Sequence, residues 1–257
     1  MKQFLHTAEQ ALQLSRETIK QYFRKRIDVD NKADDSPVTI ADRKTEQLMR
    51  DVITQQHADH GILGEEHGVI NADATWQWVL DPIDGTKSFI SGMPTFGTLI
   101  GLTMDKQPQM GIVDMPILDE RWVGVKGQQT TYNEVPCQVS KVTELSDAML
   151  YCTEPNMYTE QQWPIFKSLC DQVQMRRYGG DCYNYGLLAS GQIDLVVEGD
   201  LKYYDVSALV PVVEGAGGII TDWQGQPLHE GWNGLVVAAA TQELHQAALA
   251  ILSQYSE

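Results

Sequence analysis

The sequence predicts a mixed α/β (α+β) fold in which helices and sheets stack in layers. Residues 3–26 and a stretch from Thr39 to about His57 carry helical patterns, and residues 76–125 contain short apolar runs separated by turns. Beyond Met149, strand and helix patterns alternate. We expect a single domain over residues 1–257, with helices and a mainly antiparallel sheet in 1–145 and an alternating α/β sub-domain in 146–257.

The first predicted helix is amphipathic. Its apolar residues recur at mostly three- and four-residue spacings: Phe4, Leu5, Ala8, Leu12, Ile19, Tyr22 and Phe23. A polar break over residues 31–37 follows, and Thr39 then has the position of an N-cap for the second helix. Asp42 would therefore lie in the first turn of that helix.

The strands of the first half are predicted from apolar runs at 76–80, 96–104, 110–115 and 121–125. Polar turns separate these runs, which favours a meander of neighbouring strands. After Met149 the predicted order is a strand, helix 161–172, a strand, helix 181–190, strand 193–198, helix 205–216, strands 218–222 and 234–239, and helix 241–254. The glycine-rich run 215–218 follows a helix, whereas a nucleotide-binding loop must follow a strand, so we interpret it as a helix stop.

Composition excludes several classes of protein. A hydrophobic content of 42% and a charged content of 21% are ordinary for a folded globular chain, and the formal net charge of −16 disfavours binding to nucleic acid or to anionic membranes. Most of this acidity is expected to serve solubility. The cysteines form no CxxC pair, so we expect reduced thiols. The amino terminus lacks an apolar signal core and no run approaches the roughly 20 apolar residues of a membrane span, which predicts a cytoplasmic protein.

Two carboxylates follow the predicted strand 76–80. Pro82 stiffens the turn between Asp81 and Asp84 and keeps these like charges close together. Close carboxylates repel unless a cation lies between them, and Mg²⁺ prefers hard oxygen ligands of this kind. Gly85 lets the backbone approach an anion, and the hydroxyl of Thr86 can orient a water. The turn therefore predicts a metal site beside a phosphate site.

Two further acidic segments, Gly64 to Glu66 and Tyr204 to Ala208, combine with this turn in a recognisable order. With Pro37 to Asp42 upstream and Glu214 to Gly218 downstream, they resemble the inositol monophosphatase family of metal-dependent phosphomonoesterases over nearly the whole chain. The segments from Asp81 to Ile100 and from Gly179 to Tyr183 look most like its L-histidinol phosphate branch. Tyr204, where the family more often has tryptophan, and Lys87, where the inositol branch has a small polar residue, depart from the pattern.

The resemblance implies a layered αβαβα sandwich of the inositol monophosphatase/fructose bisphosphatase type, a homodimer, and a set of site residues. The implied metal ligands, for two or three Mg²⁺ ions, are the carboxylates of Glu65, Asp81, Asp84 and Asp205 and the backbone carbonyl of Ile83. The implied catalytic residues, which would orient the attacking water, are Glu65, Thr86 and Asp42. The expected substrate contacts come from Gly85, Thr86, Asp181, Asn184, Glu198 and Asp205.

The expected reaction is direct in-line hydrolysis of a small-molecule phosphate by a metal-activated water, with L-histidinol phosphate as the first candidate, which implies a role in histidine biosynthesis. Asp181, Asn184 and Glu198 could accept hydrogen bonds from its ammonium and imidazole groups. Carboxylates accept from hydroxyls as readily, so inositol monophosphate or a related sugar or nucleotide phosphate stays open. A non-catalytic metal-binding protein of the same fold is the alternative from another class. His57 and His60 are interpreted as structural.

Overall fold

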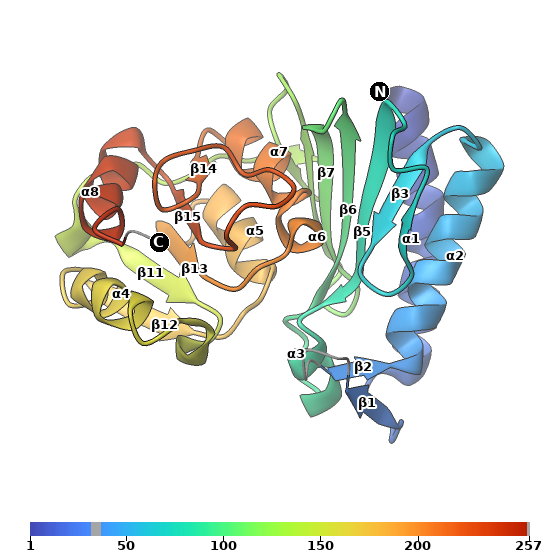
Figure 1. Cartoon of the computed structure of the whole chain (residues 1–257), viewed down its shortest axis with the longest axis horizontal. Coiled ribbons are helices and arrows are strands. Elements are labelled where there is room, and N and C mark those ends of the chain that lie inside the picture. The colour runs from blue at the N-terminus through green and yellow to red at the C-terminus, as the bar shows by residue number, and fades with distance from the viewer. Residues whose placement is uncertain (32–36, 256–257) are drawn as a thin grey trace.

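The computed structural model describes residues 1–31 and 37–255, and these residues form five stacked layers (Figure 1). Helices α1 (Lys2–Tyr22) and α2 (Ile40–Gln56) pack on each other and cover the outer face of the larger of two main sheets. Helices α4 (Gln162–Cys170) and α8 (Gln242–Leu252) cover the outer face of the smaller one. The polar break predicted over 31–37 lies mostly outside the described residues.

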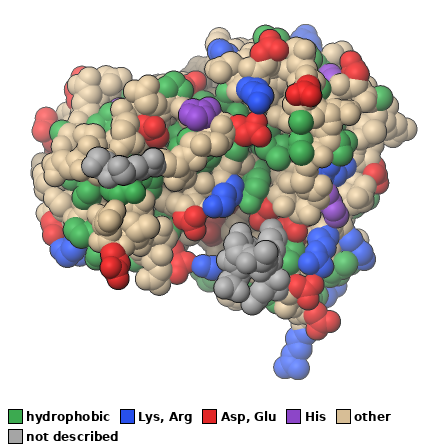
Figure 2. All heavy atoms as spheres, viewed as in Figure 1, with side chains coloured by type: hydrophobic (Ala, Val, Ile, Leu, Met, Phe, Trp, Pro, Cys, Tyr) green, Lys and Arg blue, Asp and Glu red, His purple; other side chains and the backbone are tan. Residues whose placement is uncertain are grey.

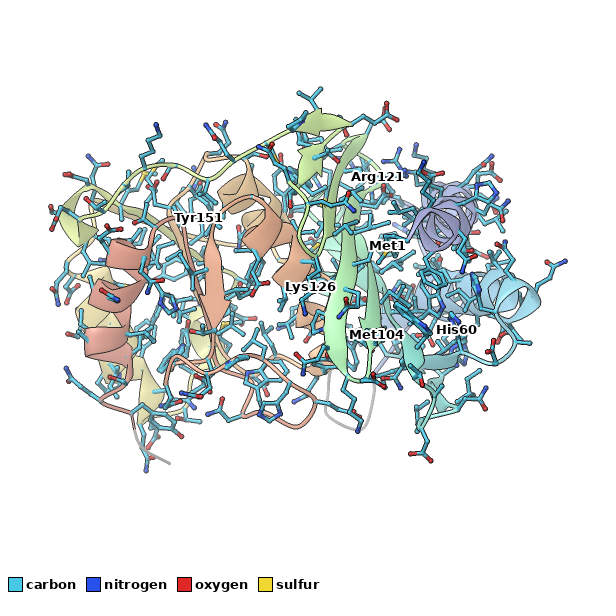
Figure 3. All side chains as sticks on the ribbon, turned by 90° about the horizontal axis from the view of Figure 1, so that it is seen from above. Met1, His60, Met104, Arg121, Lys126 and Tyr151 are labelled. Carbon is cyan, nitrogen blue, oxygen red and sulfur yellow. The ribbon has the colours of Figure 1, made fainter. Side chains whose placement is uncertain are left out.

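Three short helices form the middle layer, between the two sheets: α5 (Tyr183–Ala189), α6 (Tyr203–Val206) and α7 (Leu209–Gly215). Seen from above, the layers keep the same order (Figure 3). The αβαβα sandwich is therefore confirmed. The helix predicted over 205–216 is two helices. The first begins earlier because the backbone N–H of Lys202 donates to the carboxylate of Asp205 at 2.6 Å, which caps the chain at that point.

The larger sheet has eight strands in the described part of the chain. Their order across the sheet is β10 (Val135–Pro136), β9 (Thr131–Tyr132), β8 (Glu120–Val125), β7 (Gln107–Met115), β6 (Gly97–Met104), β5 (Trp76–Asp84), β3 (Gly61–Gly64) and β4 (Gly68–Ile70). Neighbours are antiparallel except β3 and β5, which are parallel. The predicted antiparallel meander corresponds to β5 through β8.

The smaller sheet has five strands among the described residues. Their order is β12 (Met175–Tyr178), β11 (Met149–Cys152), β13 (Leu195–Glu198), β15 (Val236–Ala239) and β14 (Ile219–Thr221). Strand β11 is parallel to both neighbours, whereas β15 is antiparallel to both of its own. A hairpin of β1 (Val29–Asn31) and β2 (Pro37–Thr39) and two 3₁₀ turns, η1 (Leu145–Asp147) and η2 (Pro155–Met157), complete the chain with helix α3 (Thr86–Ser91).

Two element boundaries differ from the prediction. Helix α1 ends at Tyr22 and not near residue 26, because Phe23 is extended and Arg24 has a positive φ of 58°. Strand β5 continues past Leu80 to Asp84, with an irregular register against β6 between Asp81 and Asp84. Such an irregularity re-aims side chains. It lets both carboxylates of one strand turn to the same side.

The apolar residues of each layer meet in separate clusters. One cluster joins α1 and α2 to the larger sheet, one lies between the sheets around α5 and α7, and one joins the smaller sheet to α4 and α8. The middle cluster includes Val79 and Trp122 from the larger sheet and Val196 and Val236 from the smaller one. The two halves of the chain therefore share apolar packing on either side of the middle helices.

The charged side chains are spread over the surface. On the face in Figure 2, Asp and Glu lie scattered with Lys and Arg between them, which fits an acidity that serves mainly solvation. Among the described residues, no helix combines the length and apolar character needed to cross a membrane. All four cysteines lie in this part of the chain and carry free thiols, as predicted.

Candidate active site

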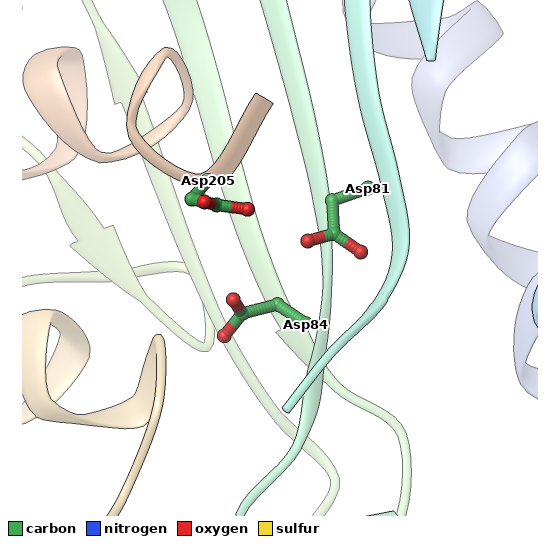
Figure 4. A group of neighbouring side chains, drawn as sticks. All are labelled: Asp81, Asp84 and Asp205. Carbon is green, nitrogen blue, oxygen red and sulfur yellow. The ribbon is translucent and has the colours of Figure 1, made fainter. Parts of the chain in front are cut away.

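Three aspartates converge between the larger sheet and the middle layer. Asp81 and Asp84 come from the end of β5, and Asp205 comes from α6 on the opposite side (Figure 4). One carboxylate oxygen of each lies within 4.8 Å of the others. The structure thus brings together residues that are more than 120 positions apart in the chain.

Burial and the charges of neighbouring carboxylates raise the pKa of all three carboxyls. For Asp81 the largest cause is desolvation, followed by the charges of Glu65, Asp84 and Asp205. For Asp84 it is desolvation, followed by Asp181 and Asp205. Desolvation also raises the pKa of Asp205 to about 7. Each carboxyl therefore lacks the positive charge that would keep it ionised in this environment.

Glu65 approaches the same place from the turn between β3 and β4. Its backbone N–H donates to the carbonyl of Leu80 at 3.2 Å, which ties this turn to the strand that carries Asp81. Its carboxylate is close enough to raise the pKa of Asp81 and of Asp205. This turn follows strand β3, which pairs in parallel with β5 and was not predicted from the sequence.

Asp42, Thr86 and Ile83 form one hydrogen-bonded group beside the aspartates. Asp42 is fully buried in the first turn of α2, where Oδ2 accepts the backbone N–H of Thr39 at 2.8 Å and its hydroxyl at 2.6 Å. The hydroxyl of Thr86 lies 3.2 Å from both Asp42 Oδ1 and the carbonyl oxygen of Ile83. Since a hydroxyl carries a single proton, Thr86 donates to either oxygen and keeps lone pairs for a further donor.

Gly85 links this group to the smaller half of the molecule. Its φ of 87° is left-handed, and a Cβ added here would lie 2.7 Å from the carboxylate carbon of Asp181. Glycine is therefore required at this position. Asp181 in turn accepts from the hydroxyl of Ser88 at 2.6 Å, and Asp84 accepts from the backbone N–H of Cys182 at 2.6 Å. The turn after β5 and the loop before α5 are thus held against each other.

A cavity of about 440 Å³ opens above these residues, and Glu65, Gly85, Thr86, Asp181 and Asp205 all line it. An ion pair lies on its wall, with Lys87 Nζ 2.7 Å from Glu154 Oε2. A smaller cavity of about 60 Å³ is lined by Asp84, Asp181, Glu198 and Asp205. Most of the predicted site residues therefore line one or other of these two cavities, and the larger cavity has room for a small metabolite.

Glu198 lies at the wall of the smaller cavity with both oxygens engaged. Oε1 accepts the backbone N–H of Thr153 at 2.9 Å and its hydroxyl at 2.5 Å, and Oε2 accepts the hydroxyl of Tyr185 at 2.8 Å. Burial raises the pKa of Glu198 to about 7. Asn184, the remaining predicted contact, is fully buried against Gly180 and is not among the described residues that line either cavity. Its contact with substrate stays a prediction.

Comparison with known proteins identifies the family. The model of the inositol monophosphatase family matches residues 1–257. The chain belongs to this family. A bifunctional phosphatase, IMPL2, from the chloroplast of Arabidopsis thaliana is 48% identical over 244 residues, which cover 91% of this chain and 70% of that protein. A histidinol-phosphatase of Chlorobaculum parvum is 35% identical, with 91% and 90% covered. A solved inositol monophosphatase from Zymomonas mobilis is 43% identical, with a TM-score of 0.90 and 98% of each chain covered.

Family membership shows a phosphatase, and enzymes of the inositol monophosphatase family use Mg²⁺. The donor chemistry of this chain fits that ion. Asp81, Asp84 and Asp205 offer hard carboxylate oxygens within 4.8 Å of one another, and each has a raised pKa that a nearby cation would lower again. A divalent cation among them would remove the repulsion that burial makes costly.

The sequence did not predict two residues that line the larger cavity, Thr153 and Glu154. Thr153 holds Glu198 and also accepts the backbone N–H of Asp181 at 3.1 Å, while Glu154 pairs with Lys87. Both directly follow β11, and ligands of α/β sheets bind at the carboxyl ends of strands. That position was the signal that could have found them.

The histidines set aside as structural lie before the start of β3, whereas Glu65 follows the end of that strand. His60 accepts the indole N–H of Trp78 at 3.1 Å, stacks on His57 with ring centroids 4.6 Å apart, and lies on the side of the larger sheet that faces α1 and α2 (Figure 3). Burial lowers the pKa of both imidazoles. These contacts support the structural interpretation.

Proposed function

We propose that this protein is a Mg²⁺-dependent phosphomonoesterase that converts L-histidinol phosphate to L-histidinol. The observation that carries the proposal is the acidic wall beside the three aspartates. Asp181, which packs directly against Gly85, lines both cavities, and Glu198 lines the smaller one. Glu154 and Asp200 add carboxylates to the lining of the larger cavity, where they pair with Lys87 and Lys202. Such a wall favours a substrate whose organic part is cationic.

The relatives support the same substrate. The histidinol-phosphatase of Chlorobaculum parvum matches over 91% of this chain, and similar enzymes of Mycobacterium tuberculosis and Streptomyces coelicolor are each 34% identical. An ammonium group would donate to Asp181 or Glu198, which accept hydrogen bonds from neutral hydroxyl and backbone N–H groups. A role in histidine biosynthesis follows from the substrate proposal.

In the proposed mechanism, Glu65, Asp81, Asp84, Asp205 and the carbonyl of Ile83 hold the metal ions. When bound, Mg²⁺ polarises the phosphate, lowers the pKa of water and offsets the charge of the leaving oxygen. Because the proton of Thr86 is directed to Asp42 or to Ile83, its oxygen can accept a hydrogen from the attacking water and orient it. Asp42, fixed by Thr39, holds Thr86 in that orientation.

The rest of the site would hold the substrate in line with that water. The backbone N–H groups of Gly85 and Thr86 are proposed to bind phosphate oxygens, and Asp181 and Glu198 are proposed to fix the organic part. The hydrogen bonds from Thr153 and Tyr185 keep Glu198 in one rotamer, so the leaving group meets a fixed partner. No covalent phosphoenzyme is needed in this arrangement.

A second candidate is inositol monophosphate. The solved relative from Zymomonas mobilis, at 43% identity over 98% of the chain, is an inositol monophosphatase. The hydroxyls of a polyol donate to the same carboxylates as an ammonium group. We also propose one domain over residues 1–257 and a cytoplasmic location, as the sequence predicted, and a homodimer, as the family resemblance implied.

Phosphate release with and without Mg²⁺ tests the proposal, with L-histidinol phosphate, inositol 1-phosphate, fructose 1,6-bisphosphate and adenosine 3′,5′-bisphosphate compared by kcat/KM. We expect the highest kcat/KM with L-histidinol phosphate, because a cationic group makes charge-assisted hydrogen bonds to the carboxylates, and these are stronger than the bonds that a hydroxyl makes. A higher kcat/KM for inositol 1-phosphate would replace the substrate assignment. Mg²⁺ binding without turnover of any compound would indicate a non-catalytic protein.

A further inference from the structure

Helix α2 carries a row of buried polar side chains that lie outside the cluster of Asp81, Asp84 and Asp205. Asp42, Glu46 and Arg50 recur every four residues on the same face of the helix, and all three are at most 6% exposed. Asp42 reaches Thr86, as described above. Glu46 and Arg50, one and two turns further along, reach a different part of the site.

Glu46 binds the backbone of the turn that bears Glu65. Its Oε2 accepts the N–H of Glu66 at 2.7 Å, and its Oε1 accepts the N–H of His67 at 3.1 Å. The side chain is completely buried, so water does not replace these bonds. A buried carboxylate that accepts two backbone N–H groups fixes the conformation of the segment that supplies them.

Arg50 completes the arrangement. Its Nε donates to Glu46 Oε1 at 2.7 Å, which compensates the buried negative charge, and its Nη2 donates to the carbonyl of Gly68. Consecutive residues of the turn, Glu66, His67 and Gly68, are therefore each bound by one of two side chains. Glu65 is the residue directly before this held segment.

The side chains of Glu46 and Arg50 pack tightly against the backbone of the turn at Gly64. A Cβ added at Gly64 would overlap the carboxylate of Glu46 and come within 2.8 Å of Arg50 Nη2. The backbone on the other side of Glu65 is thus in direct contact with the same ion pair. Glu65 is also tied to β5 by its N–H bond to Leu80, so its Cα has little freedom to move.

We propose that Glu46 and Arg50 are positioning residues that aim the carboxylate of Glu65 at the metal-binding space beside Asp81 and Asp205. This inference rests on the proposed function of that space. Glu46 is not among the described residues that line either cavity. It acts through the turn, as residues behind a ligand commonly do, and their replacement typically weakens metal binding by about 10- to 100-fold.

The test compares Glu46→Gln with Asp51→Asn, an exposed acid on the same helix whose carboxylate accepts a hydrogen bond from Gln47. Glutamine keeps the shape of the side chain but presents an NH₂ group to a backbone N–H and leaves Arg50 without its counter-charge. Isothermal titration with Mn²⁺ should show about 10- to 100-fold weaker binding to Glu46→Gln and unchanged binding to Asp51→Asn. The half-saturating Mg²⁺ concentration for phosphate release should rise by a similar factor.

A merely structural role gives a different result. It lowers the melting temperature of Glu46→Gln while the folded protein, titrated at 10 °C, binds Mn²⁺ like wild type, and that outcome would overturn the proposal. If Glu46→Gln does not fold, Arg50→Lys keeps the positive charge but loses the second donor to Gly68, and unchanged Mn²⁺ binding in it has the same meaning. Wild-type protein that binds Mn²⁺ but releases no phosphate would refute the proposed function and leave the positioning result intact.

Discussion

Replacing Asp84 by asparagine should increase the stability of the metal-free protein against unfolding and decrease the stability of the protein in Mg²⁺. Two unit charges 4.8 Å apart, the limiting separation in the aspartate cluster, repel by about 3 kcal/mol at an effective dielectric constant of about 20. Because protonation of the carboxyls already relieves part of the repulsion, only one repelling pair of charges is included for Asp84. Asparagine still accepts the N–H of Cys182, but the loss of charge weakens that bond by about 1 kcal/mol. The net gain is about 2 kcal/mol.

For a chain of this length, about 2 kcal/mol corresponds to a melting temperature about 4–8 °C higher in EDTA. In Mg²⁺ the order reverses by about 0.7 kcal/mol, since a ligand at 100 times its Kd stabilises the wild type by about 2.7 kcal/mol and the variant, without the Asp84 ligand, loses this stabilisation. Differential scanning calorimetry at pH 8 in EDTA and in Mg²⁺ measures both, with Asp51→Asn as a control for loss of one surface charge. A variant that melts lower in EDTA and keeps the full Mg²⁺ shift would refute the reasoning.

Three other substitutions address separate parts of the site and fold. Thr86→Val removes the hydroxyl shared by Asp42 and Ile83, so steady-state kinetics should show kcat reduced by more than about 100-fold with a small change in KM; an equal kcat would exclude the water-orienting role. Glu198→Gln should reduce kcat/KM more for L-histidinol phosphate than for inositol 1-phosphate, and equal losses would remove Glu198 from amine recognition. Burial lowers the pKa of His245, so the unfolded chain takes up a proton that the native state refuses, and stability falls as pH drops below about 6.5. His245→Gln should therefore lose less melting temperature than wild type between pH 7.5 and 5.5, and an identical loss would contradict this.

Local patterns predicted the helix that carries Asp42 and the strand that leads to Asp81. Thr39 caps α2 as expected, with its hydroxyl accepting the N–H of Ala41 at 3.1 Å, because capping depends on residues close in sequence. The strand before Asp81 was equally clear from its aromatic and apolar run. Since Asp81 and Asp84 follow that strand and Asp205 belongs to a distant acidic motif, their convergence was predicted from the family resemblance and not from spacing.

The sequence did not predict the residues that hold other site residues in place through contacts with distant parts of the chain. Glu46 and Arg50 read in sequence as an ordinary exposed i, i+4 ion pair, and their burial depends on the turn at 65–68 folding over them. Thr153 gains its role only when β11 and β13 pair and bring it to Glu198. The hairpin of β1 and β2 has strands of three residues, too short for a period of two to be visible.

The central claim is that Asp81, Asp84 and Asp205 hold the metal that this phosphatase uses. Anomalous diffraction from crystals grown with Mn²⁺ tests it most directly, because the signal locates the metal without reference to activity. We predict at least one peak bounded by these three carboxylates, with Glu65 turned toward it. Mn²⁺ bound elsewhere, with the three carboxylates hydrogen-bonded to one another or to water alone, would contradict the account.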